Sequence, residues 1–322
     1  MTALTHRFVE TNGIRMHIAE QGAGPLVVLC HGFPECWYSW RHQLSALAAA
    51  GFHAVAADQR GFGQTDCPEP IAAYEMFQLC GDIVGLVQAL GETRAIIVGH
   101  DFGSPVAYRC ALLRPDLFHA VALLSVPFLQ RSWQDIQPTK LMRLLAGEQI
   151  FYQEYFQTPG IADAELNADP RKTLLMMLYS LSGDPPPEQR ARPFLTRSEG
   201  FLDTLSLPDS LPPWVSEADL DVLAHEFERT GFRGGLNWYR NIDRGWECTS
   251  FLAGATLPQP TLFIGGESDA VVAIFGAAIA AMETTAPRLY RKVLLPGAGH
   301  WIHQERPAEV NALLLEFLAS LR

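Results

Sequence analysis

The sequence predicts an α/β protein in which a mostly parallel, twisted sheet carries helices on both faces. Short apolar runs alternate with segments of helical periodicity through the first third of the chain. This alternation stops after Pro127 and resumes near residue 260. Strands that alternate with helices are joined by crossovers, which favours parallel pairing. We therefore expect residues 1–127 and 251–322 to form one core, and residues 128–250 to form a helical cap.

Short apolar runs in the first part of the chain are typical of buried strands, because turn residues close each of them. These runs are 25–32, 53–61, 94–101 and 119–126. Two helices are expected between them, one ending near Gly51 and one ending near Gly91, because glycine commonly ends a helix. A third helix should begin directly after Asp101, because Pro105 suits a first helical turn.

The last part of the chain repeats this pattern. Strands are predicted at 260–269 and 291–300, with a helix near 273–283 between them. A closing helix is predicted from six apolar residues that share one face, Val310, Leu313, Leu314, Phe317, Leu318 and Leu321. The cap segment holds aromatic-rich helical stretches, and no convincing buried strand is expected there.

Composition excludes several classes of protein. The 322 residues carry a formal net charge of −11, which disfavours nucleic acid as a partner. No signal-peptide pattern and no apolar stretch long enough for a membrane span is found, so we expect no membrane insertion. The six cysteines form no CxxC pair, which favours free thiols and a cytoplasmic location. We expect neither a metal nor a cofactor.

Polar residues follow the ends of the predicted strands, which is where open α/β sheets bind ligands. Asp101 lies between Gly99 and Gly103, the spacing of a nucleophile elbow. Asp269 and His300 follow two later strands, in the chain order nucleophile, acid, histidine. Taken singly, Asp269 could be a helix cap and His300 a structural histidine. Their order and positions together favour a catalytic triad.

An aspartate at the elbow restricts the chemistry. A carboxylate is ionised near neutrality, since its ordinary pKa is about 3.9, and it needs no base before it attacks. It suits a saturated carbon with a leaving group, and the product is an alkyl ester of Asp101. His300, oriented by Asp269, would then activate a water that attacks this ester. The backbone N–H groups of Phe33 and Phe102 are expected to stabilise the resulting oxyanion.

Two leaving groups are compatible with this chemistry. A halide requires N–H donors, often from indoles, and would make the protein a haloalkane or haloacid dehalogenase. An epoxide oxygen leaves as an alkoxide and requires a proton or a strong hydrogen bond, which a phenol can supply. The cap should therefore direct either tryptophans and amides or tyrosines at Asp101. A catalytically inactive ligand-binding protein on the same scaffold is a third alternative.

Seven segments together resemble the α/β-hydrolase-fold epoxide hydrolases, in particular soluble vertebrate and mycobacterial members. They are HGFPECWYSWRHQ, DQRGFGQT, GHDFGSPVA, FYQEYFQTPG, GFRGGLNWYRN, GGESDAVV and GAGHWIHQERP. The resemblance covers essentially the whole chain, cap included. It implies an α/β-hydrolase fold whose cap follows the strand after the nucleophile helix. It also implies a cis Phe33–Pro34 bond.

The same resemblance implies an epoxide hydrolase that forms vicinal diols, with Asp101 as the nucleophile. Asp269 and His300 match the charge-relay pair. Tyr152 and Tyr239 match the two tyrosines that bind the epoxide oxygen. Because the triad and both tyrosines are present, the inactive binding protein is disfavoured. We expect water and a small apolar epoxide as substrates, and a homodimer is possible.

The chain departs from the family pattern at two positions. Phe102 stands where the family commonly has tryptophan, and this removes an indole that dehalogenases use to bind halide. Cys36 stands where serine is common, and we attach no functional consequence to it. His31 and His100 are expected at turn or packing positions near the site, and His303 at the surface or rim.

Overall fold

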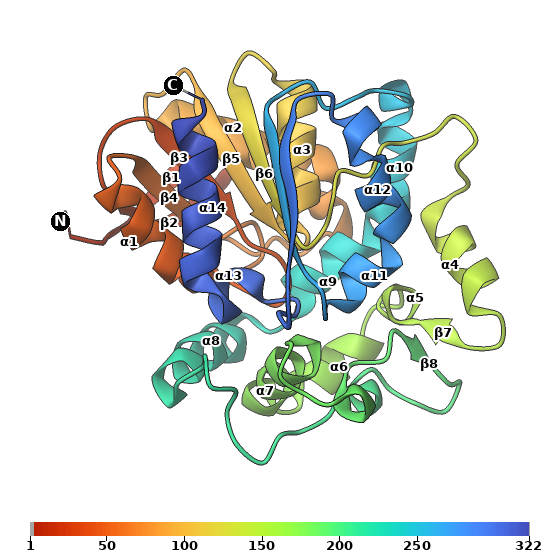
Figure 1. Cartoon of the computed structure of the whole chain (residues 1–322). Coiled ribbons are helices and arrows are strands. Elements are labelled where there is room, and N and C mark those ends of the chain that lie inside the picture. Colours follow the sequence, from red (N-terminus) through yellow and green to blue (C-terminus); the bar gives the residue numbers. More distant parts are fainter. Residues whose placement is uncertain (1–2, 322) are drawn as a thin grey trace.

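The computed structural model, which describes residues 3–321, confirms the predicted fold class (Figure 1). Eight strands form one sheet in the order β1-β2-β4-β3-β5-β6-β9-β10. From β4 to β10 all neighbours are parallel, whereas β2 is antiparallel to both β1 and β4. The strands are β1 (Thr5–Thr11), β2 (Ile14–Gln21), β3 (Leu26–Cys30), β4 (His53–Ala57), β5 (Ala95–His100), β6 (Phe118–Leu124), β9 (Thr261–Gly266) and β10 (Leu289–Leu295).

Helices cover both faces of the sheet, as predicted. All residues of β3 and β5 are buried, because helices pack on either side of the central strands. Two clusters of buried apolar residues lie on the two faces. In β3, Val27 and Leu29 belong to the cluster with α1 and α14, and Val28 and Cys30 belong to the cluster with α2 and α3. The core helices are α1 (Arg41–Ala49), α2 (Met76–Ala89), α3 (Gly103–Leu113), α11 (Ala270–Ile274), α12 (Gly276–Thr285), α13 (Ile302–Glu305) and α14 (Pro307–Ala319).

Most predicted elements are present, with shorter bounds. The helix expected after Asp101 is α3, and Pro105 lies in its first turn. The single helix expected near 273–283 is two helices, α11 and α12. The prediction omitted the hairpin β1–β2 at the edge of the sheet. Its signal was Asn12–Gly13, which joins the strands with φ values of 45° and 76° and is a common hairpin dipeptide.

The segment between β6 and β9 is mainly helical. Its helices are α4 (Pro138–Ala146), α5 (Tyr152–Tyr155), α6 (Ile161–Asn167), α7 (Pro170–Leu181), α8 (Glu217–Thr230), α9 (Arg233–Arg240) and α10 (Ile242–Cys248). It also contains one antiparallel pair of two-residue strands, β7 (Ile150–Phe151) and β8 (Phe194–Leu195), where no buried strand was expected. Figure 1 shows α5 to α8 beyond one end of the sheet. The cap limits at residues 128 and 250 stay a prediction.

Two further observations concern the chain as a whole. All six cysteines are free thiols, as predicted, and four of them are buried. Within residues 3–321, no helix combines the length and the apolar character that crossing a membrane requires.

Candidate active site

Asp101 lies directly after β5, in the turn that leads into α3. Its φ is 48°, a left-handed value that few non-glycine residues adopt, and its side chain is buried. A Cβ at Gly103 would lie 2.0 Å from the carbonyl oxygen of Cys30, and one at Gly32 would lie 2.4 Å from Asp101 Oδ1. The turn therefore requires glycine at these close approaches, which explains the small residues around the aspartate.

His300 lies between the two aspartates. Its Nε2 is 3.6 Å from Asp101 Oδ2, and its Nδ1 is 3.3 Å from each carboxylate oxygen of Asp269. Burial alone lowers the pKa of His300, but the charges of Asp269, Asp101 and Glu35 outweigh it and raise the pKa to about 9. The structure thus brings the three predicted triad side chains together.

Asp269 has two structural roles at once. Its Oδ1 accepts the backbone N–H of Val271 at 2.8 Å and so caps α11, which is the simpler role considered for this residue. It also faces His300. Burial raises the pKa of Asp269, but His300 and the hydrogen bonds to Asp269 lower it below its usual value. Helix capping and orientation of the histidine are therefore compatible.

One of the two expected oxyanion donors contacts the nucleophile directly. The backbone N–H of Phe33 donates to Asp101 Oδ1 at 3.0 Å, and the Phe33–Pro34 bond is cis. Among residues 3–321, Asp101 accepts no hydrogen bond from the N–H of Phe102, so this donor stays a prediction. The Phe102 ring packs edge-on against Tyr239, with ring centroids 4.7 Å apart.

Tyr152 and Tyr239 reach the same pocket from the helical segment. Tyr152 begins α5 and Tyr239 lies in α9, and their ring centroids are 6.2 Å apart. Burial and the nearby Asp101 raise the pKa of Tyr152; for Tyr239, burial and then Tyr152 and Asp101 raise it. The Gln153 amide donates to the Tyr152 hydroxyl oxygen at 2.9 Å. Both phenols are therefore neutral near pH 7, and each keeps an O–H proton.

The pocket between core and helical segment is largely apolar. Asp101, His300, Tyr152, Tyr239 and Arg192 are its polar lining residues. The others are Phe33, Phe156, Met177, Leu181, Ala191, Pro193, Phe201, Leu205, Ala270, Val271 and Ile274. No tryptophan, asparagine or glutamine lines this pocket in the described part of the chain.

The sequence prediction missed Ser125, which follows β6 and is fully buried. Its Oγ lies 2.5 Å from Asp269 Oδ2 and 3.0 Å from His300 Nδ1. Its position was the signal that could have identified it, because Ser125 follows β6, the strand that pairs with β5 and so lies beside the strand that leads to Asp101.

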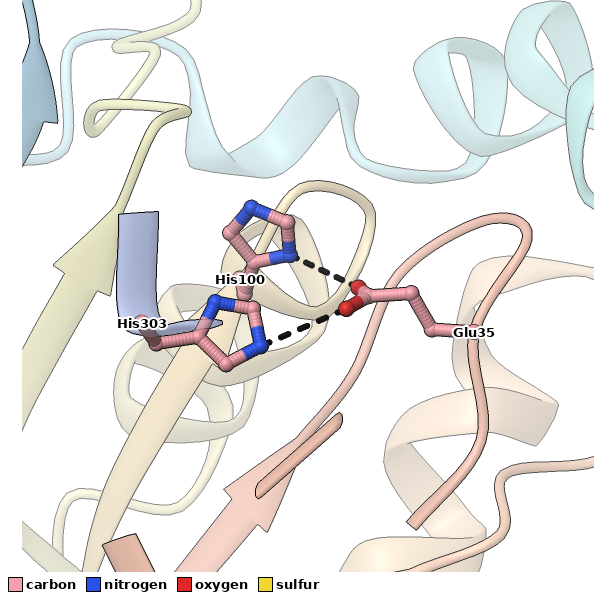
Figure 2. Close-up of side chains that lie close together, drawn as sticks. All are labelled: Glu35, His100 and His303. Atoms are coloured by element: carbon pink, nitrogen blue, oxygen red, sulfur yellow. Dashed lines mark hydrogen bonds and ion pairs between the residues drawn. The ribbon is translucent and has the colours of Figure 1, made fainter. Parts of the chain in front are cut away.

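Glu35 is a second residue that the sequence prediction missed. It is buried, and Figure 2 shows its carboxylate beside His100 and His303. Its Oε2 accepts the backbone N–H of Gly32 at 2.8 Å and contacts His100 Nδ1 at 2.7 Å. The other ring nitrogen of His100 lies 2.8 Å from the carbonyl oxygen of His300. Burial opposes ionisation of Glu35, but His100 and His303 hold its pKa well below the usual value. Glu35 thus links the loop after β3, the end of β5 and, through His100, the segment that holds His300.

His303 completes this cluster, and its expected place at the surface or rim is wrong. The residue is fully buried, and its Nε2 lies 3.3 Å from Glu35 Oε1. Burial and the neighbouring His100 lower the pKa of His303 to about 3, so its ring is neutral near pH 7. Atoms of Glu35, His100 and His303 lie within 4.8 Å of one another, as metal ligands would. Both nitrogens of His100 already have partners, so the ring has none free for a metal ion.

The fold and this site define a hydrolase of the α/β hydrolase fold, and the chain matches the model of that family over residues 25–307. Epoxide hydrolase A of Mycobacterium tuberculosis is 50% identical over 325 residues, with 100% of this chain and 99% of the relative covered. An epoxide hydrolase from an endophytic Streptomyces has a TM-score of 0.96 at 48% identity, covering 99% of this chain and 96% of that chain. Epoxide hydrolase A from Mycobacterium thermoresistibile has a TM-score of 0.93 at 48% identity, covering 98% of both chains. The chain belongs to the epoxide hydrolases of this fold.

Proposed function

We propose that this epoxide hydrolase converts a small apolar epoxide and water into a vicinal diol through an ester of Asp101. One observation carries the proposal. A carboxylate at the elbow and two phenols from the helical segment line the same pocket, with a buried histidine beside the carboxylate. These groups are a nucleophile for carbon, acids for the leaving oxygen and a base for water.

The first step is ring opening by Asp101. Phe33 holds Oδ1, and Oδ2 is the oxygen that lies nearer His300 and attacks an epoxide carbon. The carbon–oxygen bond of the ring breaks, and its electron pair moves to the ring oxygen. Tyr152 and Tyr239 hydrogen-bond that oxygen and supply a proton to the alkoxide. The Gln153 amide helps, because it stabilises the negative charge that develops on Tyr152.

The second step is hydrolysis of the ester. His300 removes a proton from a water, and the hydroxide attacks the carboxyl carbon of Asp101. Oδ1 becomes the oxyanion and is stabilised by the N–H of Phe33 that already binds it. The bond between the carboxyl carbon and Oδ2 then breaks, and Oδ2 leaves as a diol oxygen that takes the proton from His300. The carboxyl group of Asp101, with one oxygen from water, returns its own proton to the phenolate formed in the first step and becomes a carboxylate again.

The charges of the site prepare His300 for the second step. In the free enzyme the negative charge of Asp101 is one of the influences that raise the pKa of His300 to about 9. Esterification removes this charge, so the pKa of His300 falls when a base is needed. The first step thereby makes the base for the second available.

The pocket favours an epoxide over a halogenated substrate. A halide ion needs N–H donors, and no indole or carboxamide side chain lines the pocket in the described residues. The guanidinium of Arg192, which does line it, donates to Glu199 and to the carbonyl oxygen of Asp203. The indole of Trp238, which neighbours Tyr239 in sequence, donates to the carbonyl oxygen of Arg60. The apolar lining supports an aryl- or alkyl-substituted epoxide as substrate.

The test uses the His300→Gln variant in a single turnover with styrene oxide and excess enzyme. We expect the peptide that contains Asp101 to gain the mass of the intact epoxide, because the ester forms and cannot be hydrolysed. The matched control is an Asp101→Ala/His300→Gln double variant, which should gain no mass. Normal steady-state turnover by His300→Gln would contradict the assigned roles.

A further inference from the structure

We propose that Ser125 is a positioning residue whose hydroxyl bridges His300 and Asp269, weakens their direct hydrogen bond and so keeps the histidine available as the base that activates water. The inference rests on the proposed function, since it concerns ester hydrolysis. It starts from distances: Ser125 Oγ is 3.0 Å from His300 Nδ1, whereas both oxygens of Asp269 are 3.3 Å from that nitrogen. The serine oxygen is therefore the nearest of these three to the ring nitrogen.

Counting protons gives the direction of each hydrogen bond. A serine hydroxyl has one proton, and an ionised carboxylate can only accept. Because Ser125 Oγ lies 2.5 Å from Asp269 Oδ2, a length typical of a hydroxyl that donates to a carboxylate, its proton points to Asp269. Toward His300 the same oxygen can then only accept. Nδ1 of His300 must carry a proton, and the lone pair of the neutral ring is left on Nε2, which faces Asp101.

The backbone at Ser125 is an independent observation. Its φ is 66°, and among residues 3–321 only Asn12 and Asp101 also have positive φ without being glycine. Ser125 directly follows β6, and Asp101 directly follows the adjacent strand β5. The two left-handed residues therefore lie side by side at the carboxyl ends of these strands. The Ser125 N–H donates to the carbonyl oxygen of Ile264 in β9 at 2.9 Å, which anchors this turn. Strained residues cluster at functional sites when the surroundings hold them.

Several titratable groups contact His300 or lie on the segments packed around it, and the serine acts on one of them. They are Asp101 of the elbow, Asp269 before α11, Glu35, His100 and His303 of the buried cluster, Glu305 of α13, and Tyr152 and Tyr239 across the pocket. Ser125 donates to the carboxylate of Asp269, which reduces the negative charge that His300 experiences. None of the other groups contacts the serine hydroxyl in the described structure.

Removal of the hydroxyl has two opposite consequences. Loss of the acceptor at Nδ1 disfavours the imidazolium. A carboxylate of Asp269 freed from Ser125 favours it, because its hydrogen bonds to Nδ1, now 3.3 Å long, can shorten. The second effect is larger, because hydrogen bonds to a charged acceptor are about twice as strong as neutral ones. The pKa of His300 in the alkyl-enzyme should rise, by about one unit for loss of one charge-assisted bond.

The experiment measures the rate of alkyl-enzyme hydrolysis in single turnovers of styrene oxide as a function of pH. Hydrolysis needs neutral His300, so its rate falls below the pKa of that residue. In Ser125→Ala we expect this acid limb to move to higher pH by about one unit, with alkyl-enzyme accumulating near neutral pH. The rate of Asp101 alkylation should stay within about threefold of the wild type, since His300 does not act in that step.

Two further variants keep the proposal testable if Ser125→Ala is unstable. Ser125→Gly also lacks the hydroxyl and suits the positive φ, so it should fold and show the same shift. Ser104→Ala is the matched control. Ser104 is also fully buried near the elbow, but within residues 3–321 its hydroxyl hydrogen-bonds only the carbonyl oxygens of Gly99 and Leu124. Its acid limb should stay at the wild-type pH.

The outcomes separate the two proposals. An acid limb at the wild-type position in both Ser125 variants would overturn the role of the serine. Equal shifts in Ser104→Ala and the Ser125 variants would also overturn it, because loss of any buried hydroxyl would then explain the result. Absence of an Asp101 ester from the wild type and from His300→Gln would instead overturn the proposed function.

Discussion

The core and the helical segment hold their contributions to the site in different ways. Asp101, Asp269 and His300 come from strand ends and are held by backbone turns, hydrogen bonds and one another's charge. The hydroxyl of Tyr152 has one hydrogen-bond partner, Gln153, and that of Tyr239 has none within residues 3–321. Buried charges need fixed partners, and a buried O–H without an acceptor costs free energy. The two phenols therefore favour a ligand that offers an acceptor oxygen in the pocket. The core therefore holds the charges, and the helical segment holds two O–H groups that have no acceptor within residues 3–321.

The largest effect is expected from the core nucleophile. Asp101→Ala removes the only group proposed to bond to carbon, so turnover should fall on the order of 10⁴-fold or more. Steady-state diol formation from styrene oxide measures this loss. A matched control is Asp116→Ala, an exposed carboxylate paired with Arg114, which should leave turnover unchanged. Comparable losses in both variants would show that the effect is not specific to the elbow.

The next largest effect is expected from the two phenols. Tyr152→Phe and Tyr239→Phe should each slow alkylation about 10-fold or more, and the double variant about 10²- to 10⁴-fold, the usual range for general acid catalysis. Ester hydrolysis should change little, because the ring oxygen is already protonated. Rapid-quench measurement of ester formation and decay separates the two rates. If both variants slowed only ester decay, the division between core and helical segment would be wrong.

The charge pairing of His300 predicts a pH-dependent stability. The folded-state pKa is about 9 and the unfolded value is near 6.5, so the pairing stabilises the protein fully below about pH 6.5. This stabilisation is lost as the pH rises from 6.5 through 9, and it amounts to about 3 kcal/mol. Urea unfolding at pH 6 and at pH 9.5 measures the free energy of unfolding at each pH. Between these two values the wild type should lose about 3 kcal/mol more of it than His300→Gln does. Equal losses would contradict the raised pKa.

The smallest effect is expected from Gln153, which lies beside the site. Gln153→Leu removes the donor to Tyr152, so alkylation should slow about threefold to tenfold, the range for one neutral hydrogen bond. Ester hydrolysis should be unchanged. Gln189→Leu is a suitable control, because the amide oxygen of Gln189 accepts from the partly buried Tyr179 instead. An unchanged alkylation rate in Gln153→Leu would show that the amide does not assist the phenol.

The sequence predicted the core better than the helical segment. Buried parallel strands are continuous apolar runs, and turn residues mark their ends, so the spacing around Asp101 and the positions of Asp269 and His300 could be recognised. Tyr152 and Tyr239 have no local signal, since aromatic residues in such helices usually only pack. They were identified through the family resemblance alone.

The residues that the prediction missed act through contacts distant in sequence. Ser125 meets Asp269 across 144 positions and His300 across 175, and Glu35 meets His100 across 65. No periodicity or spacing in one sequence encodes such contacts. The burial of His303 was missed for the same reason, because it depends on Trp40 and His100, whose rings pack against it with centroids 4.4 Å away.

A single turnover in ¹⁸O-water tests the central claim most directly. Excess enzyme is mixed with styrene oxide, and the diol and the peptide containing Asp101 are weighed by mass spectrometry. The proposed mechanism predicts one ¹⁸O atom in Asp101 and none in the diol, because water attacks the carboxyl carbon of the ester. Label in the diol and none in Asp101 would mean that water opens the epoxide directly, and would contradict nucleophilic attack by Asp101.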